Sequence, residues 1–408
     1  MMQPIKLAVF FDQKLQAGGG YQQALNAAML AKQIPLDVCI PFFFTTVANN
    51  ISVLRGYGIE AHFLSIPKWR HILLRLRAHI RWASALHFVH RWAGENIVED
   101  YLTQHEIDLV YFTSPTSLAL NLERLNYIFT VWDLCHRDDP EFPEVRDDRE
   151  FERREALYSS TLTKAVAVLV DSETSKKNVI RRYGVNNERA HVIPFAPAIS
   201  TQISEDKYKS DYIDIKFKYK LETDYVFYPA QFWSHKNHVY LLNGLKVLEE
   251  KYNTRMSAIF AGSDAGGNLE YVKKVAQDIG LSERIRFAGF VPNEEAPYLY
   301  QQALALVMPT YFGPTNLPPL EAFLLGVPVL YPDKHGLREQ VGNAALLMDL
   351  QNPASMAEHL ANLMTDEKLR NDLVNNGKER VSLLNDEDRL KTLVNIIVDY
   401  QARRVCWK

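Results

Sequence analysis

MPTYFGPTNLPPLEAFLLGVPVL, residues Met308 to Leu330, predicts a strand end, a tight loop, a helix and a second strand. The apolar run 304–308 is typical of a buried parallel strand. Prolines in the loop keep it out of a helix, and the pair Pro318-Pro319 suits a helix's first turn. Gly326 is a typical helix stop, and residues 327–330 predict the next strand. The stretch therefore indicates a helix between two strands.

The predicted helix start has the properties of a phosphate site. The N–H groups of Asn316, Leu317 and Leu320 are predicted to point out of this end, where unpaired donors and the helix dipole attract phosphate. Glu321, in or just past the same turn, would repel an anion but could accept hydrogen bonds from sugar hydroxyls beside the phosphate. The alternative is that Glu321 only favours the helix dipole.

Composition indicates a soluble globular protein. The chain has 408 residues, which suggests two or three domains, and its net charge of −3 gives no argument for nucleic-acid binding. Its three cysteines, Cys39, Cys135 and Cys406, are far apart, which fits a reducing cytoplasm. We see no signal peptide, and no apolar run approaches the ~20 residues of a membrane-spanning helix.

Short apolar runs alternate with helix-like segments along most of the chain. This alternation predicts α/β domains with parallel sheets. The runs are Ile5–Phe11, Leu36–Phe44, Leu109–Phe112, Tyr127–Trp132, Val166–Val170 and His191–Phe195, then Tyr225–Tyr228, Ser257–Phe260, Ile285–Phe287, Leu304–Met308, Pro328–Tyr331 and Ala345–Met348. After the first run, a glycine-rich turn that includes Gly19 and Gly20 would let the backbone approach a ligand, although a plain flexible loop is an equal alternative.

Polar residues follow two of these runs. Asp133 and His136 come after Tyr127–Trp132, where open α/β sheets bind ligands, and could handle an acceptor hydroxyl. Alternatively, Asp133 caps a turn. Lys236 lies just before a predicted helix and could neutralise a diphosphate, or it is an ordinary exposed loop lysine.

The segment 68–92 is basic and aromatic. It contains six lysines and arginines and no acid, with apolar residues at helical spacing. Such a helix can lie on an anionic membrane surface, which would place the protein at the inner face of the cytoplasmic membrane. The alternative is a surface helix packed on the sheet with its arginines in water.

Pro318-Pro319-Leu320-Glu321-Ala322, followed by Gly326-Val327-Pro328-Val329, resembles the donor-site segment of family 4 glycosyltransferases of the GT-B fold. The resemblance implies an α/β protein with two Rossmann-like domains facing each other across a cleft, and a Glu321 that holds the nucleotide ribose. Gly313 stands where the family has a second Glu. Thr315 and Asn316 are the nearest side chains that could contact the sugar instead.

Two other motifs also resemble those of the family, and each has one residue that differs from the usual one. Lys236 matches the lysine that grips the diphosphate, while Gln231 replaces its arginine partner. Trp132 stands where the family has the His of a His-Asp motif, and Asp133 is kept. Further positions that the resemblance places around the donor are Gly19, Gly20, Gly262, Phe290 and Leu317.

The resemblance also implies an organisation and an activity. Residues 1–200 would bind the acceptor, residues 201–385 the nucleotide sugar, and residues 386–408 would form a helix crossing back to the first domain. The expected activity is retaining transfer from a nucleotide-diphosphate sugar to a hydroxyl of a glycan or lipid-linked glycan in bacterial polysaccharide or lipopolysaccharide synthesis. Asp133, Lys236 and Glu321 would carry it, without a cofactor or metal. The alternative is a non-catalytic nucleotide-sugar-binding or scaffold protein of the same fold.

Overall fold

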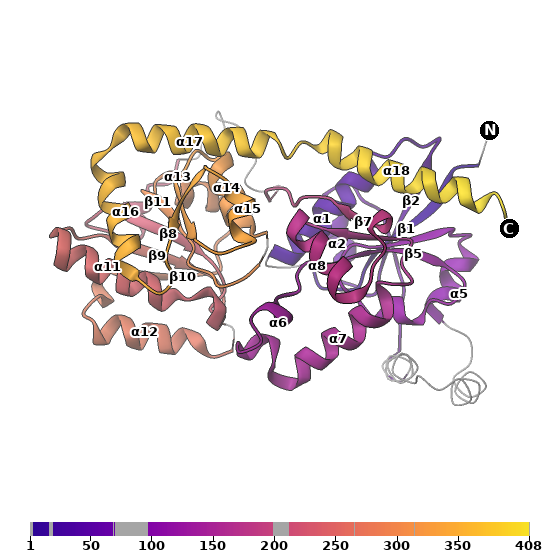
Figure 1. Ribbon diagram of the computed structural model, residues 1–408, viewed down its shortest axis with the longest axis horizontal. Coiled ribbons are helices and arrows are strands. Elements are labelled where there is room, and N and C mark those ends of the chain that lie inside the picture. The colour runs from indigo at the N-terminus through magenta and orange to yellow at the C-terminus, as the bar shows by residue number, and fades with distance from the viewer. Residues whose placement is uncertain are drawn as a thin grey trace. The chain divides into compact units, whose positions relative to one another are not determined.

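The computed structural model describes residues 3–15, 19–67, 69, 97–198, 212–264, 266–313 and 315–407. The chain forms two compact units (Figure 1). Unit 1 comprises residues 1–134, 149–194 and 386–408, and unit 2 comprises residues 135–148 and 195–385. Each unit contains the parallel sheet that the sequence predicts, so the α/β fold class is confirmed.

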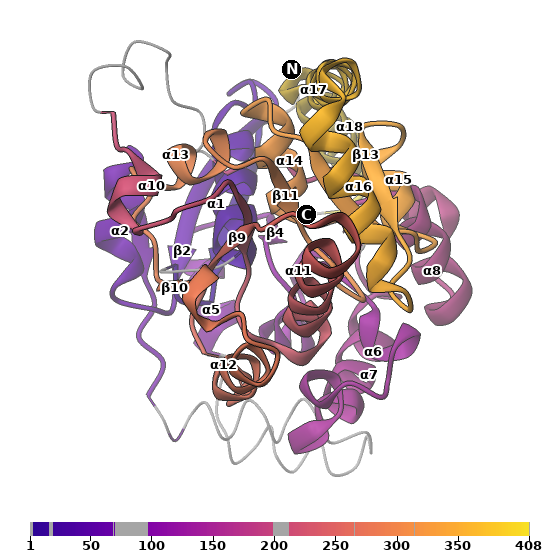
Figure 2. The ribbon, with the colours of Figure 1, turned by 90° about the vertical axis from the view of Figure 1, so that its left-hand side faces the viewer.

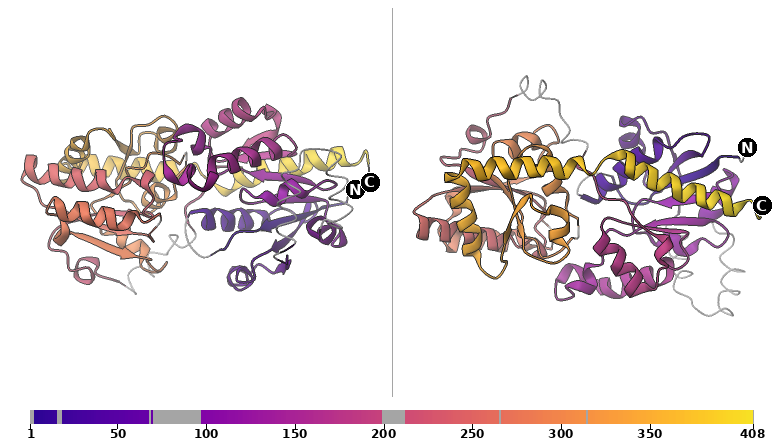
Figure 3. Two further views of the ribbon diagram at one scale, coloured as in Figure 1. Left: turned by 90° about the horizontal axis from the view of Figure 1, so that it is seen from below. Right: turned by 45° about the horizontal axis from the view of Figure 1, so that its top comes forward.

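Unit 1 contains a seven-stranded parallel sheet in the order β3-β2-β1-β4-β5-β6-β7. Its strands are β1 (Ile5–Phe11), β2 (Cys39–Thr45), β3 (Ala61–Phe63), β4 (Leu109–Phe112), β5 (Asn126–Thr130), β6 (Ala167–Val170) and β7 (Ala190–Val192). Its described helices include α1 (Gly19–Lys32), α2 (Asn50–Gly56), α5 (Ile97–Gln104), α7 (Glu150–Thr161), α8 (Glu173–Tyr183) and α18 (Asp386–Arg404). The final helix α18, yellow in Figure 3, packs beside α1.

Unit 2 contains a six-stranded parallel sheet in the order β10-β9-β8-β11-β12-β13. Its strands are β8 (Tyr225–Pro229), β9 (Ser257–Ala261), β10 (Ile285–Gly289), β11 (Ala305–Val307), β12 (Val329–Pro332) and β13 (Ala345–Met348). Its described helices include α6 (Cys135–Asp138), α10 (Ile215–Lys218), α11 (His238–Tyr252), α12 (Asn268–Asp278), α13 (Ala296–Gln301), α14 (Leu317–Leu324), α15 (Leu337–Val341), α16 (Pro353–Thr365) and α17 (Glu367–Ser382). Helices α11 and α16 lie side by side (Figure 2).

The central strands are apolar because they are covered on both faces. Every residue of β4 and β6 is buried, and β8 is buried from Tyr225 to Tyr228. Parallel strands with both faces covered are typically continuous apolar runs of this kind. Burial of these runs therefore accounts for both cores.

The strand orders determine where ligands can bind. In unit 1 the chain moves outward from β1 to β3 and then returns to the other side of β1 with β4. Unit 2 repeats this reversal between β8 and β11. Open α/β sheets bind ligands outside the carboxyl ends of the strands at such a reversal. The loops after β1, β4, β8 and β11 are therefore the first places to look for a site.

Candidate active site

Lys236 and Asn316 come together at the strand reversal of unit 2. Lys236 ends a short 3-10 turn, Ser234–Lys236, which follows β8 and precedes α11. Asn316 follows β11 and occupies the N-cap position of α14, without a capping hydrogen bond from its side chain. The Lys236 Nζ donates to Asn316 Oδ1 at 3.1 Å. A cation and a helix N-terminus therefore lie together at the carboxyl edge of the sheet, where both can interact with phosphate.

Asn316 is held by a network of hydrogen bonds and is only 8% exposed. Its Nδ2 donates to Gly313 O at 2.8 Å and to Tyr331 Oη at 2.6 Å. Its backbone N–H donates to Gln340 Oε1 at 3.0 Å. The expectation that this N–H is unpaired is therefore wrong, because the side chain of Gln340 from α15 reaches the helix start. Both amide hydrogens of Asn316 are also engaged, which makes Asn316 a support for Lys236 and the loop.

Gly313 and Thr315 complete the loop before α14. Gly313 has a φ of +105°, and a Cβ on it would lie 2.9 Å from Asn316 Oδ1. A side chain at Gly313 would therefore be strained and would disturb Asn316. Thr315 is part-buried. Leu317 is the first residue of α14 and is nearly buried. Contact of Thr315 and Asn316 with a sugar stays a prediction.

Glu321 is the fifth residue of α14, beyond its first turn. Its Oε2 accepts a hydrogen bond from the Tyr300 hydroxyl at 2.6 Å. Burial raises the pKa of Glu321, and hydrogen bonds from Tyr300 and from the backbone of Ala198 oppose this rise. Because Glu321 lies past the first turn, a favourable interaction with the helix dipole is a weak explanation for an acid here. Its carboxylate is instead oriented by a specific partner.

The loops after β8 and β9 approach each other closely. Gln231 donates to Ser263 Oγ at 3.3 Å and accepts from Trp233 Nε1 at 2.9 Å. A Cβ on Gly262 would lie 2.2 Å from Ala230 O, so only glycine permits this approach. The resemblance implies that both Gln231 and Gly262 lie at the donor site, and the structure brings their loops together at the carboxyl edge of the sheet.

Phe290 follows the last residue of β10, Gly289, which has a φ of +64°. Its side chain is 70% exposed. The neighbouring Gly262 N–H donates to Gly289 O at 2.8 Å. The loop that carries Phe290 is therefore attached to the loop that carries Gly262, and a role of either in nucleotide binding stays a prediction.

The predicted residues of unit 1 lie around Trp132. Gly19 and Gly20 begin α1, and a Cβ on Gly20 would lie 2.6 Å from the Trp132 ring. Asp133 Oδ1 accepts from Arg154 Nη1 at 2.8 Å, and both side chains are about a quarter exposed. Glycine at position 20 thus makes room for the tryptophan, and Arg154 fixes the Asp133 carboxylate.

His136 lies in a different unit from Asp133. It is in α6, which belongs to unit 2, and it is fully buried. The sequence predicted that both residues contact the acceptor. Contact with the acceptor stays a prediction for both residues. The His136 side chain has no exposed surface in this structure, so an acceptor could reach it only if that side chain became exposed.

Asp12 is a candidate that sequence reasoning missed. It directly follows β1, and it accepts hydrogen bonds from Ser114 Oγ at 3.4 Å and from Thr116 Oγ1, both of which follow β4. Burial raises the pKa of Asp12 to about 6, although the hydrogen bonds from Thr116 and Ser114 act against the rise. The available signal was its position: it is the first polar residue after the first strand, at the strand reversal.

We expect Asp12→Asn to stabilise the protein at neutral pH. The folded-state pKa of about 6 exceeds the ordinary 3.8, so the folded protein binds this proton more tightly than the unfolded chain does. The stabilisation of the folded protein by Asp12 is therefore complete below about pH 4 and is lost as the pH rises through about 6. The free energy of unfolding of the variant should rise relative to wild type by ~1–2 kcal/mol between these limits.

Urea unfolding at pH 4.5 and pH 7.5 checks this expectation. Asp37→Asn, a change at an exposed aspartate of the same unit, is the control. If the free energies of unfolding of Asp12→Asn and wild type differ by the same amount at both pH values, the raised pKa of the buried Asp12 is contradicted.

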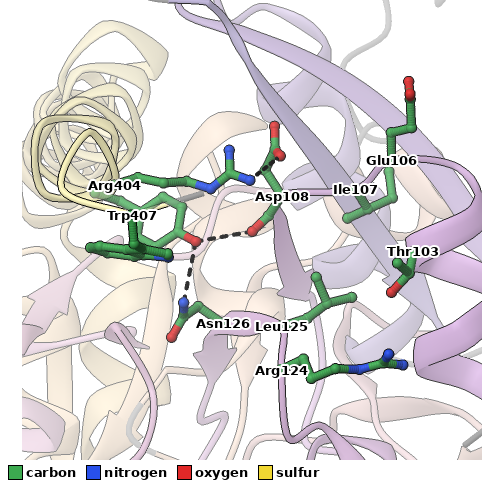
Figure 4. A pocket seen from close by; sticks show the side chains of 10 residues that line it. Thr103, Glu106, Ile107, Asp108, Arg124, Leu125, Asn126, Arg404 and Trp407 are labelled. Carbon is green, nitrogen blue, oxygen red and sulfur yellow. Dashed lines mark hydrogen bonds and ion pairs between the residues drawn. The ribbon is translucent and has the colours of Figure 1, made fainter.

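A pocket of about 340 Å³ lies at the other end of the unit 1 sheet (Figure 4). It is bounded by the residues that precede β4 and begin β5 and by the end of α18. Arg404 pairs with Asp108 at 2.7 Å, and the Tyr400 hydroxyl donates to Asp108 O at 3.0 Å. None of the residues predicted for the active site lines it. Its interactions attach α18 to the sheet.

Three further expectations concern metal binding, membrane-spanning helices and the basic segment 68–92. Among the described residues, no group of three or more His, Cys, Asp or Glu side chains is arranged to hold a metal ion. Within the same residues, no helix is both long and apolar enough to cross a membrane. The basic segment 68–92 lies outside the described residues except for Trp69.

Comparisons with known proteins give one family. The family model of the group 1 glycosyl transferases matches residues 211–380. The O-antigen chain mannosyltransferase B of Escherichia coli is 26% identical over 264 residues, 64% of this chain and 67% of that protein. The D-inositol 3-phosphate glycosyltransferase of Corynebacterium jeikeium is 27% identical over 237 residues, 55% of each chain. These matches span about half to two thirds of the relatives' own length.

A solved structure has the same fold over nearly the whole chain. The crystal structure of Alr3699/HepE from Anabaena in complex with UDP has a TM-score of 0.71 and 16% identity. The match covers 97% of this chain and 100% of that one. The matched family region, 211–380, falls within unit 2, which contains Lys236, Asn316 and Glu321.

Proposed function

Because residues 211–380 match the family model of the group 1 glycosyl transferases and the chain has the GT-B fold, we propose that it transfers a sugar from a nucleotide-diphosphate sugar to an acceptor hydroxyl with retention at the anomeric carbon. The observation that carries the proposal is the contact between Lys236 and Asn316 at the strand reversal of unit 2. It places a cation beside the start of α14, with Glu321 one turn further along the helix.

The residues of unit 2 have separate roles in this proposal. Lys236 binds the diphosphate and stabilises the negative charge that develops on it when the bond to the sugar breaks. Glu321, held by Tyr300, accepts hydrogen bonds from the ribose hydroxyls with its remaining lone pairs. Lys236 is held by Asn316 and Glu321 by Tyr300, so protein partners orient both groups, which is what electrostatic stabilisation of a transition state requires.

Unit 1 would supply the acceptor side. Asp133 pairs with Arg154, and its carboxyl oxygens can accept a hydrogen bond from an acceptor hydroxyl. Asp12 lies at the strand reversal of the same sheet and offers a second carboxyl group. We expect the acceptor to be a glycan or a lipid-linked glycan in polysaccharide or lipopolysaccharide synthesis. This expectation is supported by the similarity to the O-antigen mannosyltransferase.

A thermal-shift screen of nucleotide sugars tests the donor half of the proposal. A ligand that binds only the folded protein raises its melting temperature by mass action. One nucleotide sugar and its free nucleoside diphosphate should both stabilise the wild-type protein. If no member of a panel of UDP, GDP, ADP and dTDP sugars shifts the melting temperature, the proposed donor class is wrong.

Membrane contact is a further part of the proposal, placed on segment 68–92 at the cytoplasmic face. Changing Arg70, Arg77 and Arg81 to Gln should weaken binding to anionic vesicles by ~1 kcal/mol per charge, measured by co-sedimentation. Added salt should weaken binding of the parent protein too. The control changes three exposed arginines elsewhere in unit 1, Arg55, Arg153 and Arg181. A parent protein that ignores anionic vesicles at low salt would remove membrane contact from the proposal.

The competing function is a non-catalytic nucleotide-sugar-binding or scaffold protein. It is favoured by Gln231, Gly313 and Trp132, which differ from the residues usual in the family. A protein of this kind would respond in the thermal-shift screen but would not break the donor's bond to the sugar, so turnover separates the two functions.

A further inference from the structure

Residues 135–148 belong to unit 2, although the residues on both sides of them in the chain belong to unit 1. The segment begins with α6, and it includes a short 3-10 turn, Pro143–Val145. Its described contacts in unit 2 fall on three loops: the one before α11, the one before α14 and the one after β12. The first two of these loops contain Lys236 and Asn316. The segment therefore contacts the parts of unit 2 that the proposed function uses.

Glu144 makes the most specific of these contacts. Its Oε1 accepts a hydrogen bond from the backbone N–H of His235 at 2.8 Å and pairs with the ring Nδ1 of the same residue. The side chain of Glu144 is only 8% exposed. The hydrogen bonds to His235 lower the pKa of Glu144 against the effect of burial, which alone would raise it. A buried carboxylate with two bonds to one residue fixes the position of that residue.

His235 in turn connects both loops. Its ring stacks on Phe312 with 3.8 Å between ring centroids, and its backbone oxygen accepts from the Tyr311 N–H at 2.8 Å. Phe142 packs against the same group, with ring centroids 5.1 Å from Tyr311 and 5.5 Å from Phe312. His235 directly precedes Lys236 in the chain, so its position limits where the Lys236 side chain begins.

A second ion pair attaches residues 135–148 to the loop after β12. Lys334 Nζ lies 2.5 Å from Asp139 Oδ1 and donates to Tyr311 O at 2.8 Å. The Asp139 side chain is mostly buried. Two carboxylates of one segment thus make contact with groups that surround Tyr311. Of these two carboxylates, Glu144 is the one with described bonds to His235, the residue next to Lys236.

We propose that Glu144 is a positioning residue for the diphosphate: it holds His235, and through it Lys236, in the place where the phosphates bind. The inference rests on the proposed function, since it assigns Lys236 to the diphosphate. It adds a residue from the middle of the unit 1 sequence to the donor site of unit 2. Glu144 itself touches no ligand in this account.

A double-mutant cycle tests the proposal by calorimetric titration with UDP or with whichever nucleoside diphosphate the thermal-shift screen selects. Glu144→Ala should weaken binding about tenfold in the wild-type background. In a Lys236→Ala background the same change should have almost no effect on the affinity, because Glu144 acts through Lys236. Glu144→Gln, whose amide oxygen can still accept from the His235 N–H, should recover part of the affinity.

The controls separate this role from a general loss of structure. Glu141→Ala removes an exposed acid from the same segment and should leave binding unchanged. Equal losses from Glu144→Ala with and without Lys236 would overturn the proposal, as would wild-type affinity in Glu144→Ala. If Glu144→Ala does not fold, the same cycle with Glu144→Gln decides, and its effect must again disappear without Lys236. A wild-type protein that binds no nucleoside diphosphate would overturn the proposed function and this inference together.

Discussion

Lys236→Ala should reduce the rate of sugar transfer by about a hundredfold or more, the usual cost of losing one group that stabilises charge in the transition state. The reason is local. Lys236 Nζ is the cation beside the start of α14, and the leaving diphosphate gains negative charge as its bond to the sugar breaks. Its partner Asn316 keeps its other hydrogen bonds to Gly313 and Tyr331, so the melting temperature should change little.

Initial rates with the donor found by thermal shift measure this effect. Lys246→Ala is the matched control, because Lys246 is a part-exposed lysine on the neighbouring α11 whose described ion pairs are to Glu249 and Glu250 of the same helix. Its rate should equal that of wild type. Turnover close to wild type in Lys236→Ala would exclude Lys236 from the mechanism.

Glu321→Ala should weaken binding of the nucleoside diphosphate by roughly ten- to a hundredfold. Hydrogen bonds to a charged group contribute ~1.5–3 kcal/mol, and the change removes the carboxylate that accepts from the ribose. It also leaves the buried Tyr300 hydroxyl without its acceptor, so some loss of stability should accompany the loss of affinity.

Two further variants separate these effects. Glu321→Gln keeps an oxygen for Tyr300 but loses the charge, so it should retain stability and still bind the diphosphate less tightly. Tyr300→Phe removes the hydroxyl that orients Glu321 and should have a smaller effect on binding than Glu321→Ala. Calorimetry measures affinity and thermal melting measures stability. Full affinity in Glu321→Ala would show that the carboxylate only supports α14.

The strands and the helix of the opening stretch were predictable because their signals are local. Apolar runs of four to seven residues become parallel strands when both faces are covered, as β4 and β6 show. The proline pair and Gly326 likewise mark α14, which ends two residues before Gly326. Local signals also identified Lys236 and Asn316 as separate candidates.

The partners of these residues were not predictable, because they come from distant parts of the chain. The side chain of Gln340, 24 residues away, accepts a hydrogen bond from the backbone N–H of Asn316, and nothing in the loop sequence indicates this partner. Glu144 lies 91 residues from His235 and belongs to a segment that the sequence places among elements of the other unit. Such contacts depend on how the chain is folded.

Asp12 was missed for a different reason. The sequence shows an acid after a strand, which is common, whereas its raised pKa depends on burial beside Thr116 and Ser114. Burial of one carboxyl group is a property of the packed loops after β1 and β4. It has no signature in the residues next to Asp12.

The central claim is that the chain breaks the bond between a nucleoside diphosphate and a sugar. The most direct measurement is proton NMR of the purified protein with the donor selected by thermal shift, at first with water as the acceptor and then with added glycans. The account predicts that the nucleoside diphosphate accumulates, that the sugar appears first as the anomer present in the donor, and that Lys236→Ala suppresses both signals. A protein that binds the donor tightly and leaves it intact with every acceptor would contradict the account and would identify a binding protein.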